Sequence, residues 1–525
     1  MKTKFFLGLF IAVFSASCFA QEYGWVEFTD KKGSSFDPFT YFDAKAIERR
    51  VINDYDLYDS SDFPLNESYI SVVSSMCDSM MGYSRWFNMI FIKAGDDEIS
   101  KIKELSFVKG FTPYEMQTVP ASVAMSDTLS DDLQLQKNQV GILGGPEFGA
   151  AGFNGKGIRI AVLDGGFPSV DKHPAFKHIR DENRILKTWD FTSDKEYVYS
   201  FQSHGTSVLS CIAGINEGMP MGLATEAEFL LARTEVVPEP FSEEKNWMMA
   251  AEWADKNGAQ IINSSLGYTK DRYFPHQMDG KYTYVSRAAN MAARKGILVI
   301  NAAGNEGDKK NWKIIGAPAD ADSVLSIGGI DPDTYYHISF SSFGPTADKR
   351  VKPNVCAFGK VLAAAKSGTE TTFGTSFAAP LATGFAACAM QTRPGIKNME
   401  LYNEIEKSAT LYPYFDYAHG YGIPQAEYFL KKEAVNKKEA ALLVEINDTG
   451  LKIKVTEIYP ETEKKKNYLY YHFQNEKGFI ERYGVVDVYQ NDAFEIYDVS
   501  FYDGCTFRAH YHGSTVEIPV KQTNN

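Results

Sequence analysis

Three side chains that together can break an acyl bond occur in short, distinctive surroundings along this chain. Asp164 follows the apolar run 158–163, His204 precedes small residues and an apolar stretch, and Ser376 lies among small residues in segment 373–380. A hydroxyl, an imidazole and a carboxylate are the groups of a nucleophile, its general base and the acid that orients the base. Each alone has an ordinary explanation, as a turn Asp, a structural His or a helix-capping Ser. Together they predict nucleophilic catalysis.

The surroundings of Ser376 are the most specific of the three. Pro380 suits the first turn of a helix, where its missing N–H matters least, so we expect Ser376 near a helix N-terminus. Free backbone N–H groups and the partial positive charge there stabilise an oxyanion. Asn305 follows the apolar run 297–300 and lies between glycines. Its amide can donate to the same oxygen; the alternative is an Asn that serves a left-handed turn.

These side chains need a scaffold, and the central part of the chain predicts one. Apolar runs alternate with helical stretches such as 247–256 and 284–295; the runs are 158–163, 227–232, 260–263 and 297–300. Strands that are apolar on both faces and separated by helices predict a mostly parallel sheet covered on both sides, in three layers. In such α/β sheets the reactive groups gather at the carboxyl ends of the strands. We assign residues 140–430 to this domain.

Two smaller units flank the α/β domain. Residues 21–125 contain a strand-like run at 87–92, a helical run at 96–105 and a further strand from 107, which predicts a small α+β unit. The polar stretch 126–139 is predicted to be an exposed linker that proteases can cut. After the charged connector 431–441, alternating residues in 442–525 predict a small antiparallel β-sandwich.

Composition excludes several classes of protein. The chain has 525 residues, enough for several domains, and a net charge of −13, which opposes binding to nucleic acid or anionic lipid. Six cysteines are too few for a disulfide scaffold, and no CxxC pair suggests zinc. Beyond residue 20 no apolar run approaches the roughly 20 residues of a membrane span, so no transmembrane helix is expected in the mature chain.

The N-terminus predicts export. Lys2 and Lys4 precede the apolar run 5–14, small residues follow, and Ala20 suits a signal-peptidase cut. Residues 1–20 are therefore expected to be a signal peptide, and the protein to be secreted or held in the cell envelope. The alternatives are a buried N-terminal helix and lipid attachment at Cys18. The spacing of the remaining cysteines indicates no particular disulfide pair.

The order Asp164, His204, Ser376 and the runs around these residues resemble the subtilisin-like serine peptidases, the subtilase family or peptidase family S8. The resemblance covers about residues 140–430 and includes the runs 262–267 and 341–345. The runs 263–268 and 318–321 are closest to secreted subtilases of Bacteroidetes-type bacteria. An α/β-hydrolase esterase does not fit, because its triad runs Ser, Asp, His and its nucleophile lies in GxSxG.

The resemblance implies a role for each residue. Ser376 would be the nucleophile, His204 the general base and Asp164 the group that orients it. Asn305 and the backbone N–H of Ser376 would form the oxyanion hole. A further implied element is a substrate-binding edge that pairs with an extended peptide; it comprises Ser265, Leu266 and Gly267. The alternative for these three residues is an ordinary strand end. Expected substrates are extended or unfolded protein segments.

The resemblance also bears on the other domains. Residues 21–125 would be a pro-region that assists folding and inhibits the active site until it is cut away; the alternative is a permanent accessory domain. No cofactor is required for the chemistry. Subtilases often carry structural calcium, but the acidic loops 320–322 and 331–333 have no ligand spacing that assigns a site. The competing function is a catalytically inactive binding or scaffolding relative.

Overall fold

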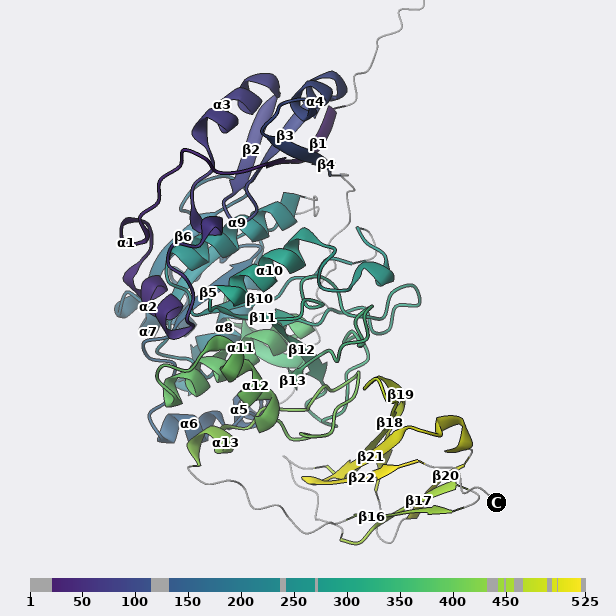
Figure 1. The fold of residues 1–525 in the computed structure, drawn as a ribbon. Helices are drawn as coiled ribbons and strands as arrows, with labels where there is room; N and C mark the ends of the chain where they lie inside the picture. Colours follow the sequence, from purple (N-terminus) through teal and green to yellow (C-terminus); the bar gives the residue numbers. More distant parts are fainter. Residues whose placement is uncertain are drawn as a thin grey trace, which may run out of the picture. The chain divides into compact units, whose positions relative to one another are not determined.

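The computed structural model describes residues 21–114, 132–236, 242–269, 272–431, 442–447, 450–457, 466–488, 493–497 and 499–520 (Figure 1). The predicted signal peptide 1–20 and nearly all of the connector 431–441 lie outside these residues. The chain forms two compact units, one of residues 1–35 and 63–116 and the other of residues 36–62 and 117–525. Among the described residues, no helix has the length and the apolar character needed to cross a bilayer.

The first unit is the small α+β fold expected from the sequence. Its antiparallel sheet has the order β2-β3-β1-β4, formed by β1 (Gln21–Phe28), β2 (Ser79–Ser84), β3 (Met89–Gly95) and β4 (Val108–Pro113). Alternate residues such as Val26, Ile90 and Ile92 form one core with the helices α3 (Glu67–Met76) and α4 (Asp96–Lys103). α4 begins with three acidic residues and ends with two lysines, which suits the helix dipole.

Residues 36–62 lie within the predicted pro-region but belong to the second unit. They form α1 (Pro38–Tyr41), α2 (Ala44–Ile52) and the 3₁₀ turn η1 (Ser60–Asp62). Asp37 and Asp43 cap the two helices by accepting the backbone N–H groups of Phe39 and Lys45. The predicted pro-region is therefore divided between the two units.

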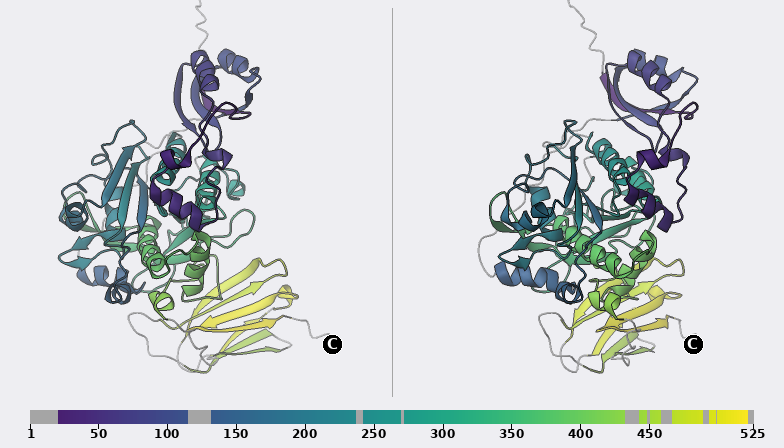
Figure 2. Two further views of the ribbon diagram at one scale, coloured as in Figure 1. Left: turned by 60° about the vertical axis from the view of Figure 1, so that its left-hand side comes forward. Right: turned by 90° about the vertical axis from the view of Figure 1, so that its left-hand side faces the viewer.

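The centre of the second unit is a seven-stranded parallel sheet in the order β13-β12-β11-β10-β5-β9-β6. Its strands are β5 (Arg159–Asp164), β6 (Ile185–Asp190), β9 (Glu228–Arg233), β10 (Ile261–Ser264), β11 (Leu298–Ala302), β12 (Val324–Ile330) and β13 (Val355–Phe358). α8 (His204–Ala213) and α11 (Thr375–Thr392) pack together against it, and so do α9 (Ser242–Lys256) and α10 (Tyr284–Arg294) (Figure 2). The predicted three-layer α/β architecture is confirmed.

The strand order places a topological switch point at the carboxyl edge of the sheet. From β5 the chain continues to β6 and β9 on one side, and only then crosses to β10 on the other side. β5 and β10 are direct neighbours, with Leu163 paired to Ser264. Loops leave such a switch point in opposite directions, which opens a space beyond the strand ends. Asp164 and Ser265 lie at this point.

The prediction that residues 126–139 form an exposed linker is wrong for residues 132–139. Residues 126–131 lie outside the described chain, but α5 (Asp132–Gly141) begins immediately after them. Gln136 donates to the carbonyl of Met219 at 2.8 Å, and Gln139 donates to those of Met221 at 2.8 Å and Leu362 at 3.1 Å. Buried glutamine amides, rather than an apolar stripe, attach this helix to the central domain. Because the attached residues are polar, the sequence of the helix resembled that of a linker.

Short elements complete the central domain. They are α6 (Gly145–Ala150), η2 (Pro174–Phe176), α7 (Lys177–Asp181), β7 (Ile215–Asn216), β8 (Met219–Pro220), η3 (Pro275–Gln277), β14 (Lys360–Ala364), β15 (Thr369–Phe373), α12 (Asn398–Ser408) and α13 (Ala426–Leu430). β14 and β15 form a hairpin that leads directly into α11. The hairpin therefore positions the start of the helix that carries Ser376.

The C-terminal residues form the expected antiparallel sandwich. One sheet has the order β16-β17-β20 and the other β19-β18-β21-β22. The strands are β16 (Leu442–Asn447), β17 (Gly450–Val455), β18 (Tyr468–Gln474), β19 (Ile480–Asp487), β20 (Ala493–Tyr497), β21 (Thr506–Tyr511) and β22 (Ser514–Pro519), with the turn η4 (Val499–Tyr502). Their core includes Ile453, Leu469 and Phe507.

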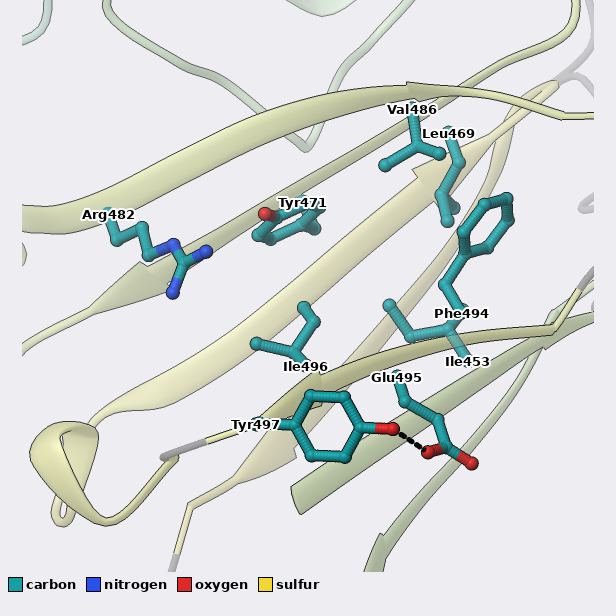
Figure 3. A pocket seen from close by; sticks show the side chains of 9 residues that line it. All are labelled: Ile453, Leu469, Tyr471, Arg482, Val486, Phe494, Glu495, Ile496 and Tyr497. Carbon is teal, nitrogen blue, oxygen red and sulfur yellow. Dashed lines mark hydrogen bonds between the residues drawn. The ribbon is translucent and has the colours of Figure 1, made fainter.

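A cavity of about 400 Å³ lies in this sandwich (Figure 3). It is lined by Ile453, Leu469, Tyr471, Arg482, Val486, Phe494, Glu495, Ile496 and Tyr497. The Tyr497 hydroxyl donates to the Glu495 carboxylate at 2.6 Å. Every lining residue belongs to the sandwich, so this cavity is separate from the predicted catalytic residues.

Candidate active site

The pair Asp164 and His204 is assembled where β5 ends and α8 begins. The buried Asp164 carboxylate accepts the N–H of Gly165 at 2.7 Å, and its two oxygens lie 2.9 and 3.0 Å from Nδ1 of His204. A carboxylate accepts only, so Nδ1 carries the proton and donates it. Nε2 of the neutral ring is then left as an acceptor, which is the state that a general base requires.

A glycine allows α8 to approach the end of β5 this closely. A Cβ atom on Gly205 would lie 2.4 Å from the carbonyl oxygen of Gly166 and 3.0 Å from Cβ of Asp164. No larger residue fits without displacing one of these backbones. The glycine after His204 in the sequence is therefore a packing requirement of the pair.

The electrostatic surroundings raise the pKa of His204 above its ordinary value. Burial alone would lower the pKa, but the Asp164 carboxylate outweighs it by charge and by hydrogen bonding. Glu235, just beyond the end of β9, adds a smaller effect in the same direction. The imidazole remains about 30% exposed, so substrate and water can reach it.

Ser376 is the second residue of α11 and contacts the loop after β10. Gly374, with φ of +146°, precedes the helix. The Ser376 hydroxyl donates to the carbonyl oxygen of Ser265 at 3.2 Å. The ring of the adjacent Phe377 packs on the His204 ring with 5.5 Å between centroids. These contacts place the serine at the same edge of the sheet as the Asp164–His204 pair.

The expectation that Pro380 lies in the first helical turn is wrong, although Ser376 is indeed near the helix start. Pro380 is the sixth residue of α11 and cannot donate to the carbonyl of Ser376. The Ser265 hydroxyl donates to that carbonyl instead, at 2.8 Å. The proline thus frees an oxygen that attaches the Ser376 backbone to the loop after β10.

Asn305 lies beyond β11 and is oriented by Thr375. Its Oδ1 accepts the backbone N–H of Thr375 at 2.9 Å and the Thr375 hydroxyl at 3.0 Å. The Thr375 hydroxyl in turn accepts the N–H of Gly304 at 3.1 Å. Nδ2 of Asn305 lies 3.4 Å from where a Cβ of Gly374 would be, at the start of α11. Thr375 was not predicted; its place between Gly374 and Ser376 was the available signal.

The comparisons with known proteins agree with this geometry. Residues 155–422, about half of the chain, match the family model of the subtilase family. The chain belongs to the subtilase family. Residues 23–129 match a second family model, the peptidase S8 propeptide domain of Bacteroidota, which confirms the resemblance to Bacteroidetes-type subtilases.

Characterised relatives share the subtilase domain with this chain. Subtilisin NAT of Bacillus subtilis subsp. natto is 28% identical over 268 residues, 50% of this chain and 64% of the relative. Subtilisin DY of Bacillus licheniformis is 28% identical over 264 residues, 50% and 86% of the two chains. Alkaline elastase YaB of Bacillus sp. is 29% identical over 261 residues, which are 49% of this chain and 61% of the relative. The chain thus spans less than two thirds of the length of Subtilisin NAT and of Alkaline elastase YaB.

The subtilase domain presents the predicted substrate edge directly after β10. Ser265 is buried and contacts Ser376 through both its hydroxyl and its carbonyl group. The Asn301 side-chain amide donates an Nδ2–H to the Leu266 carbonyl oxygen at 2.9 Å. Gly267 is exposed, and open space surrounds the position of a Cβ on it. A peptide backbone can therefore approach the chain at Gly267, two residues after the Ser265 that contacts Ser376.

The acidic loops considered for calcium use their carboxylates internally. Asp320 accepts the N–H of Gly280 at 2.7 Å and the hydroxyl of Ser286 at 2.5 Å, and burial raises its pKa to about 6. Asp331 accepts the N–H groups of Asp333 and Thr334 within its own turn. Across the described part of the subtilase, no three His, Cys, Asp or Glu side chains come together as metal ligands.

Sequence inspection also missed a buried acidic cluster near the Asp164–His204 pair. Tyr268 donates to Glu235 at 3.1 Å, Arg272 binds Glu243 at 2.8 Å, and Tyr273 donates to Glu244 at 2.7 Å. Burial raises the pKa of Glu243 to about 10 and that of Glu244 to about 7. The residues come from the segments that follow β9 and β10 and from α9, so only the fold brings them together.

Proposed function

We propose that this subtilase is a secreted serine endopeptidase that is made as a self-processing precursor. It would hydrolyse peptide bonds of extended or unfolded proteins through an acyl-enzyme. The observation that carries the proposal is the arrangement in which Asp164 orients His204 while α11 presents Ser376 beside Asn305. An inactive scaffolding relative would have no need for these groups to be held together.

Acylation begins with the serine. In the resting structure its hydroxyl donates to Ser265, so it must first rotate toward Nε2 of His204. The Ser376 oxygen then attacks the peptide carbonyl carbon while His204 takes its proton, and Asp164 stabilises the imidazolium. The negative charge on the carbonyl oxygen is stabilised by the Asn305 amide and the N–H of Ser376, which is among the helix-terminal amides without a helical acceptor.

Collapse of the tetrahedral intermediate breaks the C–N bond. His204 gives its proton to the leaving amine, and the acyl group remains on Ser376 as an ester. A water molecule then transfers a proton to His204 and attacks the ester carbonyl. The second collapse releases the new carboxyl terminus and returns the proton to Ser376.

The substrate preference follows from the exposed edge at Gly267. Pairing along a backbone edge requires a segment of peptide that is extended and free of its own secondary structure. Flexible or unfolded regions meet this requirement, whereas helices and packed strands do not. The propeptide domain is the first such partner, as an intramolecular inhibitor, and its match to the Bacteroidota propeptide family supports this role. Residues 1–20 would direct export.

Expression of residues 21–525, with the Ser376→Ala variant as the matched control, tests the proposal. The wild type should lose its N-terminal residues by a cut within 115–131 and should then degrade unfolded casein. The variant should remain whole and inactive on a denaturing gel and by intact mass. If both remain whole and neither degrades casein, the proposal is wrong and a scaffolding role is favoured. Casein digestion by an uncut wild type would instead make the N-terminal unit an accessory domain.

A further inference from the structure

Residues 36–62, here called the anchor segment, are attached to the subtilase domain through charged groups that are buried. α2 of this segment lies against the C-terminal ends of α9 and α10. Several domain residues contact this segment; those around the buried charges, here called the anchor site, are Asp255, Gly258, Ala259, Lys295 and Gly296. Both partners lie in the second compact unit, although the family match assigns the anchor segment to the propeptide.

Two arginines of α2 carry positive charge into the site. The fully buried Arg50 guanidinium donates to both oxygens of Asp255, at 2.9 and 2.8 Å, and to Asp62 at 3.2 Å. Arg49 binds Asp255 and the carbonyl of Ala259, and donates to the carbonyl of Lys295 at 3.2 Å. Those carbonyls follow the last turns of α9 and α10, where the helix dipoles favour a cation.

The subtilase domain in turn contributes a positive charge to the anchor segment. Lys295 is fully buried; its ammonium group donates to Asp62 at 2.8 Å and to the Ser61 hydroxyl at 2.7 Å. Asp62 and Asp255 both contact Arg50, and Asp62 also contacts Lys295. These four side chains therefore form one network across the contact. Each partner therefore supplies both signs of charge to the other.

The backbone of the anchor site is shaped for the segment. Gly258 and Gly296 have φ of +78° and +92° and lie two residues after the ends of α9 and α10. A Cβ on Gly258 would lie 2.9 Å from Cβ of Lys45, and one on Gly296 would lie 2.6 Å from Nδ2 of Asn53. Any other residue at either glycine would strain the backbone and also push the anchor segment away.

We propose that the anchor site is a docking surface, separate from the catalytic centre, that keeps residues 36–62 on the subtilase domain after the chain is cut within 115–131. Dissociation would require all of these buried charges to be rehydrated while their partners are removed, which makes it slow. The inference rests on the proposed function only for the event of cutting; the contact itself needs no peptidase activity.

The test uses the full precursor with Ser376→Ala, so that self-processing plays no part. A recognition sequence for an external, sequence-specific protease is placed within 115–131, the chain is cut, and the products are passed through a gel-filtration column in native buffer. We expect both pieces to co-elute. Their dissociation rate is then measured in the same precursor with Arg50→Met, which should release the N-terminal piece at least ~30-fold faster. The matched control is Asp54→Asn, which removes an exposed ion pair to Lys397 and should leave the rate within about 2-fold.

Hydrogen exchange in the cut but unsubstituted complex gives a second readout that does not depend on how a variant folds. Amides of α2 should be protected to the same degree as those at the end of α9. Separation of the pieces on the first column pass, unprotected α2 amides, or an unchanged rate in Arg50→Met would each overturn the proposal. A precursor that fails to self-process but holds its anchor segment in this test would refute the proposed function alone.

Discussion

Replacing Thr375 by valine tests the orientation of the proposed oxyanion hole without changing Ser376, the proposed nucleophile. Valine keeps the shape of threonine but removes the hydroxyl that donates to Oδ1 of Asn305 and accepts the N–H of Gly304. The backbone N–H of Thr375 still holds Oδ1 at 2.9 Å. The Asn305 amide therefore stays in place but loses one of its two constraints, and the substrate-binding edge is untouched.

The magnitude follows from these two hydrogen bonds. Loss of one neutral hydrogen bond costs about 0.5–1.5 kcal/mol, and the unsatisfied Gly304 N–H adds about 1–3 kcal/mol of instability. If the looser Asn305 loses about 1 kcal/mol of its interaction with the oxyanion, kcat falls about 5-fold. Asn305→Ala, which removes the donor completely, should reduce kcat by about 10²–10³, the range typical for a side-chain donor of this kind.

The assay is steady-state hydrolysis of a peptide substrate with kcat and KM determined separately. The oxyanion exists only in the transition state, so Thr375→Val should lower kcat and leave KM nearly unchanged. Thr375→Ser restores the hydroxyl and should recover most of the wild-type kcat. The reasoning is refuted if Thr375→Val raises KM at constant kcat, or if the serine variant is as slow as the valine variant.

Three further predictions follow from the same structure. The value of kcat/KM should fall on the acid side of its pH profile with a midpoint above the ordinary pKa of histidine, because only neutral His204 accepts a proton. Glu235→Gln should move this midpoint to lower pH, because the Glu235 charge raises the pKa of His204. An unchanged midpoint in this variant would count against the effect of Glu235. Gly205→Ala should lower the melting temperature and abolish activity, since its Cβ would lie 2.4 Å from a backbone oxygen; a fully active variant would contradict the packing argument. Burial would raise the pKa of Asp255, but the positive charges of Arg50 and Arg49 outweigh it and hold this pKa below its usual range. The ionised Asp255 therefore stabilises the folded protein at pH values above its pKa in the unfolded chain, and this stabilisation is lost as the pH falls through its pKa in the folded protein. Urea titrations of Ser376→Ala with and without Asp255→Asn should therefore differ most near neutrality and converge in acid.

The elements that carry the site were largely predictable, because each is encoded by residues close together in the chain. The apolar runs before Asp164 and Asn305 are strands, and small residues place Ser376 near a helix start. Strand periodicity and residues at strand ends are local properties, so composition and spacing reveal them. The same holds for the alternation that predicted the C-terminal sandwich.

The sequence by itself thus determined the layered α/β fold, the strand ends that carry reactive groups and the family resemblance. Only the tertiary structure decided how those groups are held: Thr375 orients Asn305, and the Ser265 hydroxyl replaces the donor that Pro380 lacks. It also decided that residues 36–62 pack with the subtilase domain, through Arg50 and Asp255, about 200 positions apart in the chain. Such contacts depend on which distant surfaces meet when the chain closes, and a single sequence contains no local signal for that.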